Sequence, residues 1–114
     1  MPRPKKMRWI QNAPDITYFK PQGVPMRMLS SVLLEMDELE ALRLADLHQM
    51  SQEDAAKEMN VSRPTFGRIV ARARGKVADA LVNGKAVQIQ GGPVMDHPKC
   101  PPGRGKGRRR HGWN

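Results

Sequence analysis

The fold of this chain is decided by residues 51–82, SQEDAAKEMNVSRPTFGRIVARARGKVADALV. Ser51 and Ser62 are typical helix N-caps, and Asn60 tolerates the left-handed backbone of a tight turn. Pro64 suits the first turn of a helix, where a missing N–H costs nothing. The stretch therefore predicts helices over about 52–59 and 63–82, joined by a three-residue turn.

The second of these helices has two chemically different faces. At about 100° per residue, one side gathers apolar residues: Phe66, Ile69, Val70, Ala73 and Val77. The opposite side carries Pro64, Arg68, Ala71, Arg72 and Gly75, with Arg63, Arg74 and Lys76 at its borders. No acid occurs from residue 62 to residue 78, so ion pairs within the helix cannot neutralise these bases. We expect the first face to be buried and the second to meet a negatively charged partner.

A helix of this kind fits the major groove of DNA, where long polar side chains reach base edges and small residues such as Gly67 and Ala71 allow close approach. The N-terminal part of such a helix reads bases. The base-reading candidates are Arg63, Pro64, Thr65 and Arg68. Other cations and free helix N-termini would meet phosphates. The phosphate candidates are Ser51, Ser62, Arg72, Arg74, Lys76, Arg3, Lys5 and Lys6. The alternative is an antiparallel helix pair in a small bundle with no role in DNA binding.

Charge is unevenly distributed along the 114 residues. Residues 35–58 hold eight acids and two bases, so they contribute −6 to a net charge of +9 and the rest contributes +15. The surplus lies in residues 3–8, 63–76 and 99–110. Basic blocks around an acidic module favour a long polyanion as the partner.

The sequence predicts one mainly α domain over residues 9–92. A flexible basic arm (1–8) precedes it, and a disordered basic tail (93–114) follows it. Short strands are expected around residues 16–19, 32–36 and 85–90. The expected fold is a helix-turn-helix core of three helices with these short flanking strands. Pairing of the residues before Asp37 and after Gly84 as a small sheet would also supply the contact of a homodimer.

The first helix of this core is expected over about residues 38–47. Asp37 is the predicted N-cap, and Glu40 completes a capping box three residues later. Leu39, Leu42 and Leu47 fall near one face of the helix, which we expect to be buried.

Other classes of function find little support. No apolar run is long enough to cross a membrane, and no secretory signal is present, so we expect a cytoplasmic protein. No arrangement of nucleophile and base marks an enzyme, and no cofactor is expected. Whether a small molecule is sensed stays open, although no excess of apolar residues indicates a pocket for one. His97, Cys100 and His111 supply only three potential zinc ligands, so no metal site is expected and their role stays open.

Residues 41–77, ALRLADLHQMSQEDAAKEMNVSRPTFGRIVARARGKV, resemble the promoter-reading C-terminal module of bacterial sigma factors. Further blocks are similar to uncharacterised protein family 0251: MPRPKK at 1–6, YFKPQGVP at 18–25, MDELEALRLADL at 36–47, NVSRPTFGRI at 60–69 and ALVNGKAVQIQGG at 80–92. That family comprises small bacterial and archaeal proteins regarded as candidate DNA-binding proteins. The resemblance covers about residues 1–92 and implies a DNA-binding fold.

The first functional expectation is a sequence-specific transcription regulator that binds double-stranded DNA. Because one such module contacts few base pairs, a homodimer or another partner is expected to add specificity. A second expectation is an adaptor that binds RNA polymerase through its acidic helix. A third is a nonspecific nucleic-acid binder that uses the tail, with Arg108, Arg109, Arg110 and Trp113.

Overall fold

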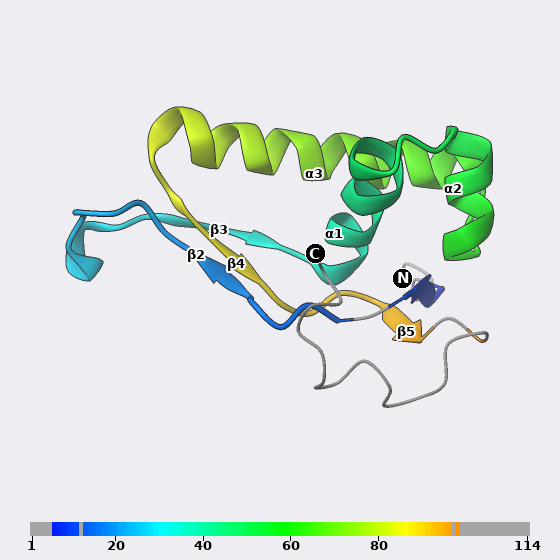
Figure 1. The fold of residues 1–114 in the computed structure, drawn as a ribbon, viewed down its shortest axis with the longest axis horizontal. Coiled ribbons are helices and arrows are strands. Elements are labelled where there is room, and N and C mark those ends of the chain that lie inside the picture. Colours follow the sequence, from blue (N-terminus) through cyan, green and yellow to red (C-terminus); the bar gives the residue numbers. More distant parts are fainter. Residues whose placement is uncertain (1–5, 12, 97, 99–114) are drawn as a thin grey trace, which may run out of the picture.

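A computed structural model describes residues 6–11, 13–96 and 98 of the chain (Figure 1). In chain order the described elements are β1 Arg8–Ile10, β2 Tyr18–Phe19, the 3-10 turn η1 Met26–Met28, β3 Ser31–Leu34, α1 Met36–Leu42, the π-helical turn η2 Arg43–Leu47, α2 Gln52–Met59, α3 Arg63–Asn83, β4 Ala86–Ile89 and β5 Val94–Asp96. This part of the chain is a small, α-rich fold with short strands, as the sequence predicts.

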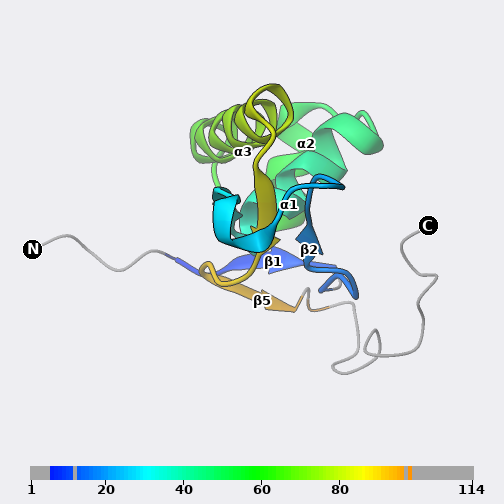
Figure 2. The same cartoon turned by 90° about the vertical axis from the view of Figure 1, so that its left-hand side faces the viewer.

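The larger sheet has β4 at its centre, with β2 and β3 on either side. β3 pairs with β4 in parallel, and β2 pairs with β4 antiparallel. The parallel pair needs a long crossover, which α1, α2 and α3 supply. Both views show these helices on one side of the strands (Figures 1 and 2). The segments predicted to form a small sheet therefore pair within one chain.

A second, two-stranded sheet pairs β1 with β5 in parallel, with Arg8 opposite Val94 and Ile10 opposite Asp96. This corrects two sequence boundaries, since Arg8 was expected in a flexible arm and residues 94–96 in a disordered tail. Gly91 and Gly92 explain the pairing, because their positive φ angles of 74° and 98° redirect the chain after β4. Ile10 is buried as a result.

The helices α2 and α3 lie where the sequence predicts them. Asn60 ends α2 in the left-handed region (φ 58°), and Gly84 ends α3 in the same way (φ 66°). Ser51 and Ser62 cap the two helices by accepting hydrogen bonds from the Asp54 and Thr65 amides.

The start of α1 differs from the expected one. Glu35, not Asp37, is the N-cap, and the Glu38 carboxylate accepts a hydrogen bond from the Glu35 amide at 2.9 Å. Asp37 is instead fully buried in the first turn. Glu40 binds the Arg43 guanidinium through both carboxylate oxygens, at 2.9 and 2.8 Å. The capping box is thus displaced by two residues toward the N-terminus.

The π-helical turn η2 changes which residues after α1 are buried. The His48 amide donates to the Arg43 carbonyl five residues back, at 2.9 Å, so this turn is wider than an α-helical one. The extra residue rotates the following side chains away from α-helical spacing. Leu47, predicted to be buried, is therefore 64% exposed, whereas Leu44 is buried.

The core has two parts, one among the helices and one between α3 and the sheet. The first contains Ala41, Leu44, Ala55, Ala56, Met59, Phe66, Ile69 and Val70. The second contains Leu34, Ala73 and Ile89. The predicted apolar stripe of α3 is confirmed, with Val77 half-buried, and every residue assigned to its opposite face is exposed.

Within the described residues, no helix has the length and apolarity needed to cross a membrane.

Gly75 within α3 and Gly84 at its C-cap should respond oppositely to alanine substitution. An added Cβ at Gly75 meets nothing within 4 Å in the helix interior, so Gly75→Ala should stabilise the fold by about 0.5–1 kcal/mol. Gly84 has φ +66°, so Gly84→Ala should destabilise it by about 1–2 kcal/mol. Urea denaturation measures both changes as shifts of the midpoint. A loss of stability in Gly75→Ala would contradict the exposed placement of that residue.

Candidate nucleic-acid interface

The turn between α2 and α3 is held by backbone hydrogen bonds. The Asn60 amide donates to the Lys57 carbonyl at 3.1 Å, and the Val61 amide donates to the Ala56 carbonyl at 3.0 Å. Below the turn, Ala55 and Ala56 of α2 are buried beside Phe66 of α3. Small side chains on α2 let the helices approach closely, so α2 supports the N-terminal half of α3 from behind.

The N-terminal turn of α3 brings together three of the predicted DNA-contacting residues. Ser62 Oγ donates to Thr65 Oγ1 at 2.9 Å, and Arg68 Nη2 donates to the same oxygen at 3.4 Å. The Arg68 guanidinium is thereby held toward the start of the helix. Arg63 and Pro64 are exposed beside it, and Thr65 is half-buried. We call Arg63, Pro64, Thr65 and Arg68 the exposed turn of α3.

Gly67 does not belong to this exposed face. It is half-buried, and a Cβ built on it would lie 3.5 Å from Gln52 Oε1 of α2. That distance is an ordinary van der Waals contact, so Gly67 lies at the border between α2 and the exposed face, and its expected place in a DNA groove stays a prediction. Ala71, in contrast, is exposed as expected.

The later cations of α3 are paired with acids of the preceding elements. Glu38, which is buried, accepts hydrogen bonds from Arg72 Nε at 3.2 Å and from Lys76 Nζ at 2.7 Å. Arg74 binds Asp46 of η2 through Nε and Nη2, at 3.1 and 2.7 Å. The absence of acids from residues 62–78 excludes ion pairs among those residues, but it does not exclude these pairs with α1 and η2.

These contacts shift the pKa values of both acids. Burial alone raises the pKa of Glu38, but hydrogen bonds from Lys76, the Glu35 amide and Arg72 outweigh it, so the pKa lies below its ordinary value. The hydrogen bond from Arg74 lowers the pKa of Asp46. Both carboxylates are therefore ionised at neutral pH, and Arg72, Arg74 and Lys76 are electrostatically compensated.

The two serine candidates use their hydroxyls as helix caps. In the first turn of α3, the Thr65 amide donates to Ser62 Oγ at 3.3 Å and Pro64 has no N–H, which leaves the Arg63 amide. In the first turn of α2, the Glu53 and Asp54 carboxylates put negative charge where a phosphate would bind. A phosphate at Ser62 would therefore find few free N–H donors, and a phosphate at Ser51 would be repelled by these carboxylates.

The basic N-terminal arm is described only from Lys6, which is exposed; Arg3 and Lys5 lie outside the described residues. Arg8 is buried, and its Nε lies 3.5 Å from Asp37 Oδ2. Burial raises the pKa of Asp37, the nearby Glu35 carboxylate raises it further, and Arg8 offsets only part of this effect. Arg8 therefore joins β1 to α1 and is not available to DNA.

Sequence reasoning missed Glu38 and Asp46 as partners of α3. One signal was present, since residues 35–58 hold eight acids and two bases and hence an excess of carboxylates.

No cluster of three His, Cys, Asp or Glu side chains that could hold a metal ion occurs in the described part of the chain. His97, Cys100 and His111 lie outside it.

We predict that Glu38→Gln destabilises the protein by about 1–3 kcal/mol at pH 7, because it weakens charge-assisted hydrogen bonds to a buried group. Since the folded-state pKa of Glu38 is lowered, its stabilisation is complete above the ordinary glutamate pKa and is lost as the pH falls through the folded-state value. The difference between variant and parent should therefore shrink in acid. Urea titrations at several pH values measure it.

The control for this prediction is Glu53→Gln, because Glu53 is exposed on α2. This variant should change stability by less than about 0.5 kcal/mol. A Glu38→Gln effect that is equally small, or that does not depend on pH, would contradict the role assigned to the buried carboxylate.

Comparison with known proteins agrees with the blocks seen in the sequence. A family profile described as "Protein of unknown function DUF134" matches residues 1–97. A UPF0251 protein of Caldanaerobacter subterraneus subsp. tengcongensis is 53% identical over 113 residues, which is 99% of this chain and 96% of the relative. A UPF0251 protein of Desulfosudis oleivorans is 60% identical over 95 residues, which is 83% of this chain and 69% of the relative. No solved structure matches the chain. The chain belongs to the UPF0251 (DUF134) family.

Proposed function

We propose that this protein is a DNA-binding transcription regulator. In this proposal α2 and α3 act as a helix-turn-helix, similar to the promoter-reading module of sigma factors, and the exposed turn of α3 enters the major groove. An α-helix with its side chains is about 10–12 Å wide, and the groove is about 12 Å wide. The function concerns binding only, and no catalytic step is part of it.

The observation that carries the proposal is the contrast between the two parts of the α3 surface. Arg63 and Arg68 are exposed at the N-terminal end, where groove-reading helices make base contacts. Arg68 is already oriented by its hydrogen bond to Thr65, which reduces the entropy lost on binding. Arg72 and Lys76, one and two turns further on, are engaged by Glu38.

This contrast changes which residues are proposed to contact bases and which are proposed to contact phosphates. Arg63, Thr65 and Arg68 are the proposed base-reading residues, with Pro64 as an exposed apolar contact. Arg74 is half-exposed and could exchange Asp46 for a phosphate at modest cost, because exposed ion pairs contribute little. Arg72 and Lys76 are proposed to position α3 rather than to bind phosphate.

The role of an RNA-polymerase adaptor has less support. It relied on the acidic helix as a docking surface, but Asp37, Glu38 and Glu40 are buried. Nonspecific binding through residues 99–114 is a separate outcome that the following experiment distinguishes.

We expect Arg68→Ala to weaken binding to a duplex selected from a random DNA pool by about tenfold or more, because a base contact contributes about 1–3 kcal/mol. Binding to a random duplex should change much less. Fluorescence anisotropy of the full chain with both duplexes measures the two affinities. Arg72→Ala should have a smaller effect on the selected duplex, because Glu38 already holds that guanidinium.

The matched control is Arg27→Ala, which removes the same charge from η1. That turn, drawn in cyan, lies at the opposite end of the molecule from α2 (Figure 1). If Arg68→Ala and Arg27→Ala have equal effects, or if deletion of residues 99–114 alone abolishes binding to the selected duplex, groove reading by α3 is wrong.

A further inference from the structure

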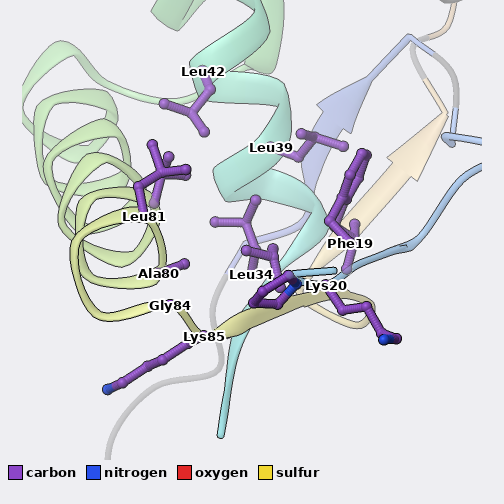
Figure 3. A pocket seen from close by; sticks show the side chains of 13 residues that line it. Phe19, Lys20, Leu34, Leu39, Leu42, Ala80, Leu81, Gly84 and Lys85 are labelled. Carbon is purple, nitrogen blue, oxygen red and sulfur yellow. The ribbon is translucent and has the colours of Figure 1, made fainter. Parts of the chain in front are cut away.

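An apolar groove lies between the C-terminal half of α3, the helix α1 and the strands (Figure 3). Its volume is about 470 Å³. One wall is a stripe formed by Val77, Ala80 and Leu81 of α3 with Gly84 at its C-cap, and Phe19 of β2 lies across from it.

The groove leaves apolar side chains exposed that a bound molecule would cover. Leu81 at its rim is 79% exposed and Phe19 is 54% exposed. Single exposed apolar residues are common on protein surfaces, but a hollow lined by them is typical of binding sites. Burial of such surface on binding stabilises a complex.

The dimensions of the groove favour a small molecule over a docked helix. The stripe from Val77 to Gly84 spans seven residue steps, or about 10 Å at 1.5 Å per residue. A helix docked along that length would be anchored over only about two turns. Pockets for small molecules usually measure about 300–1,000 Å³.

The charge at the groove favours an anion. Lys20 and Lys85 are among its lining residues, and in Figure 3 their side chains extend outward from its rim; no acid is among the described residues that line it. Lys85 Nζ is bound to Asp79 Oδ2 at 2.9 Å, so it is partly compensated, whereas Lys20 is exposed. The groove therefore combines an apolar body with a cationic edge.

The lysines at the groove also argue against two other occupants, a second copy of the chain and the chain's own terminal segments. In a two-fold dimer the same patch meets its own copy, so Lys20 and Lys85 of both copies would gather around one contact and repel each other. Residues 1–5 and 99–114 of the chain hold bases and no acids, so they too would be repelled by this edge.

We propose that the groove binds a small amphiphilic carboxylate with a hydrocarbon body about 10 Å long. The hydrocarbon would lie along the α3 stripe against Phe19, and the carboxylate would lie beside Lys20. This site is separate from the exposed turn of α3, at the other end of the same helix.

The probe is decanoate, titrated into the full chain at concentrations at which it is monomeric and followed by amide chemical shifts. Shifts should be confined to groove residues such as Phe19, Leu42 and Leu81. Decan-1-ol, which lacks the charge, and butyrate, which lacks the tail, should each bind at least about tenfold more weakly. Lys20→Glu should weaken decanoate binding by about tenfold, and Leu81→Ser should weaken it severalfold.

The control variant is Lys57→Glu, an identical charge reversal at an exposed position of α2, which should leave decanoate binding unchanged. Lys20 and Leu81 are exposed, so their substitutions should preserve the fold, as circular dichroism would verify.

Several results would overturn the proposal. These are equal affinity for decan-1-ol, equal effects of Lys20→Glu and Lys57→Glu, shifts spread over the surface, or a concentration-dependent dimer that covers the groove. Binding to anionic vesicles without binding to monomeric decanoate would point to a membrane surface instead. Because no DNA is present in the assay, failure here is independent of failure of the proposed function.

Discussion

The buried carboxylate of Glu38 links the start of α1 to the middle of α3. It accepts a hydrogen bond from its own helix start, at the Glu35 amide, and two more from Arg72 and Lys76 of α3. A buried charge is costly unless it is paired and fully hydrogen-bonded, so these donors must stay in position for the fold to persist. This side chain and the apolar cluster that contains Ala41 of α1 and Ile69 of α3 together set the orientation of α3 relative to α1, and hence to the crossover that joins β3 to β4.

This constraint divides α3 into three parts. Its N-terminal end packs on α2 through Phe66 and presents Arg63 and Arg68 outward. Its middle is held by Glu38 and Asp46, so the cations there stabilise the fold. Its C-terminal end stands beside the sheet and forms one wall of the apolar groove. A single rigid helix thus joins a candidate reading surface to a candidate ligand site.

Local signals predict α2 and α3 correctly but place the start of α1 two residues too late, and contacts between distant residues leave no local signal. The caps at Ser51 and Ser62, the left-handed Asn60 and the stripe around Phe66 each depend on residues within one or two turns, so propensity and periodicity predict them. The partners of Arg72 and Arg74 lie 34 and 28 residues away, and no periodicity reports such contacts. The π-helical turn that exposes Leu47, and the pairing of β1 with β5 from opposite ends of the chain, depend on tertiary packing in the same way.

In the proposed DNA interaction, the distribution of charge assigns nonspecific attraction and discrimination between sequences to different segments of the chain. Residues 6–98 hold twelve of the twenty bases and all eleven acids, so the part of the chain that contains the fold carries a net charge of only +1. The remaining eight bases lie in residues 1–5 and 99–114. Nonspecific attraction to phosphates scales with the number of cations engaged and weakens steeply with salt, so it should come mainly from these terminal segments. A nearly neutral fold has little bulk attraction to DNA, and discrimination between sequences must then come from a few oriented side chains. Arg68, exposed and held by Thr65, meets that requirement, whereas a uniformly basic helix face would have increased affinity for every sequence alike.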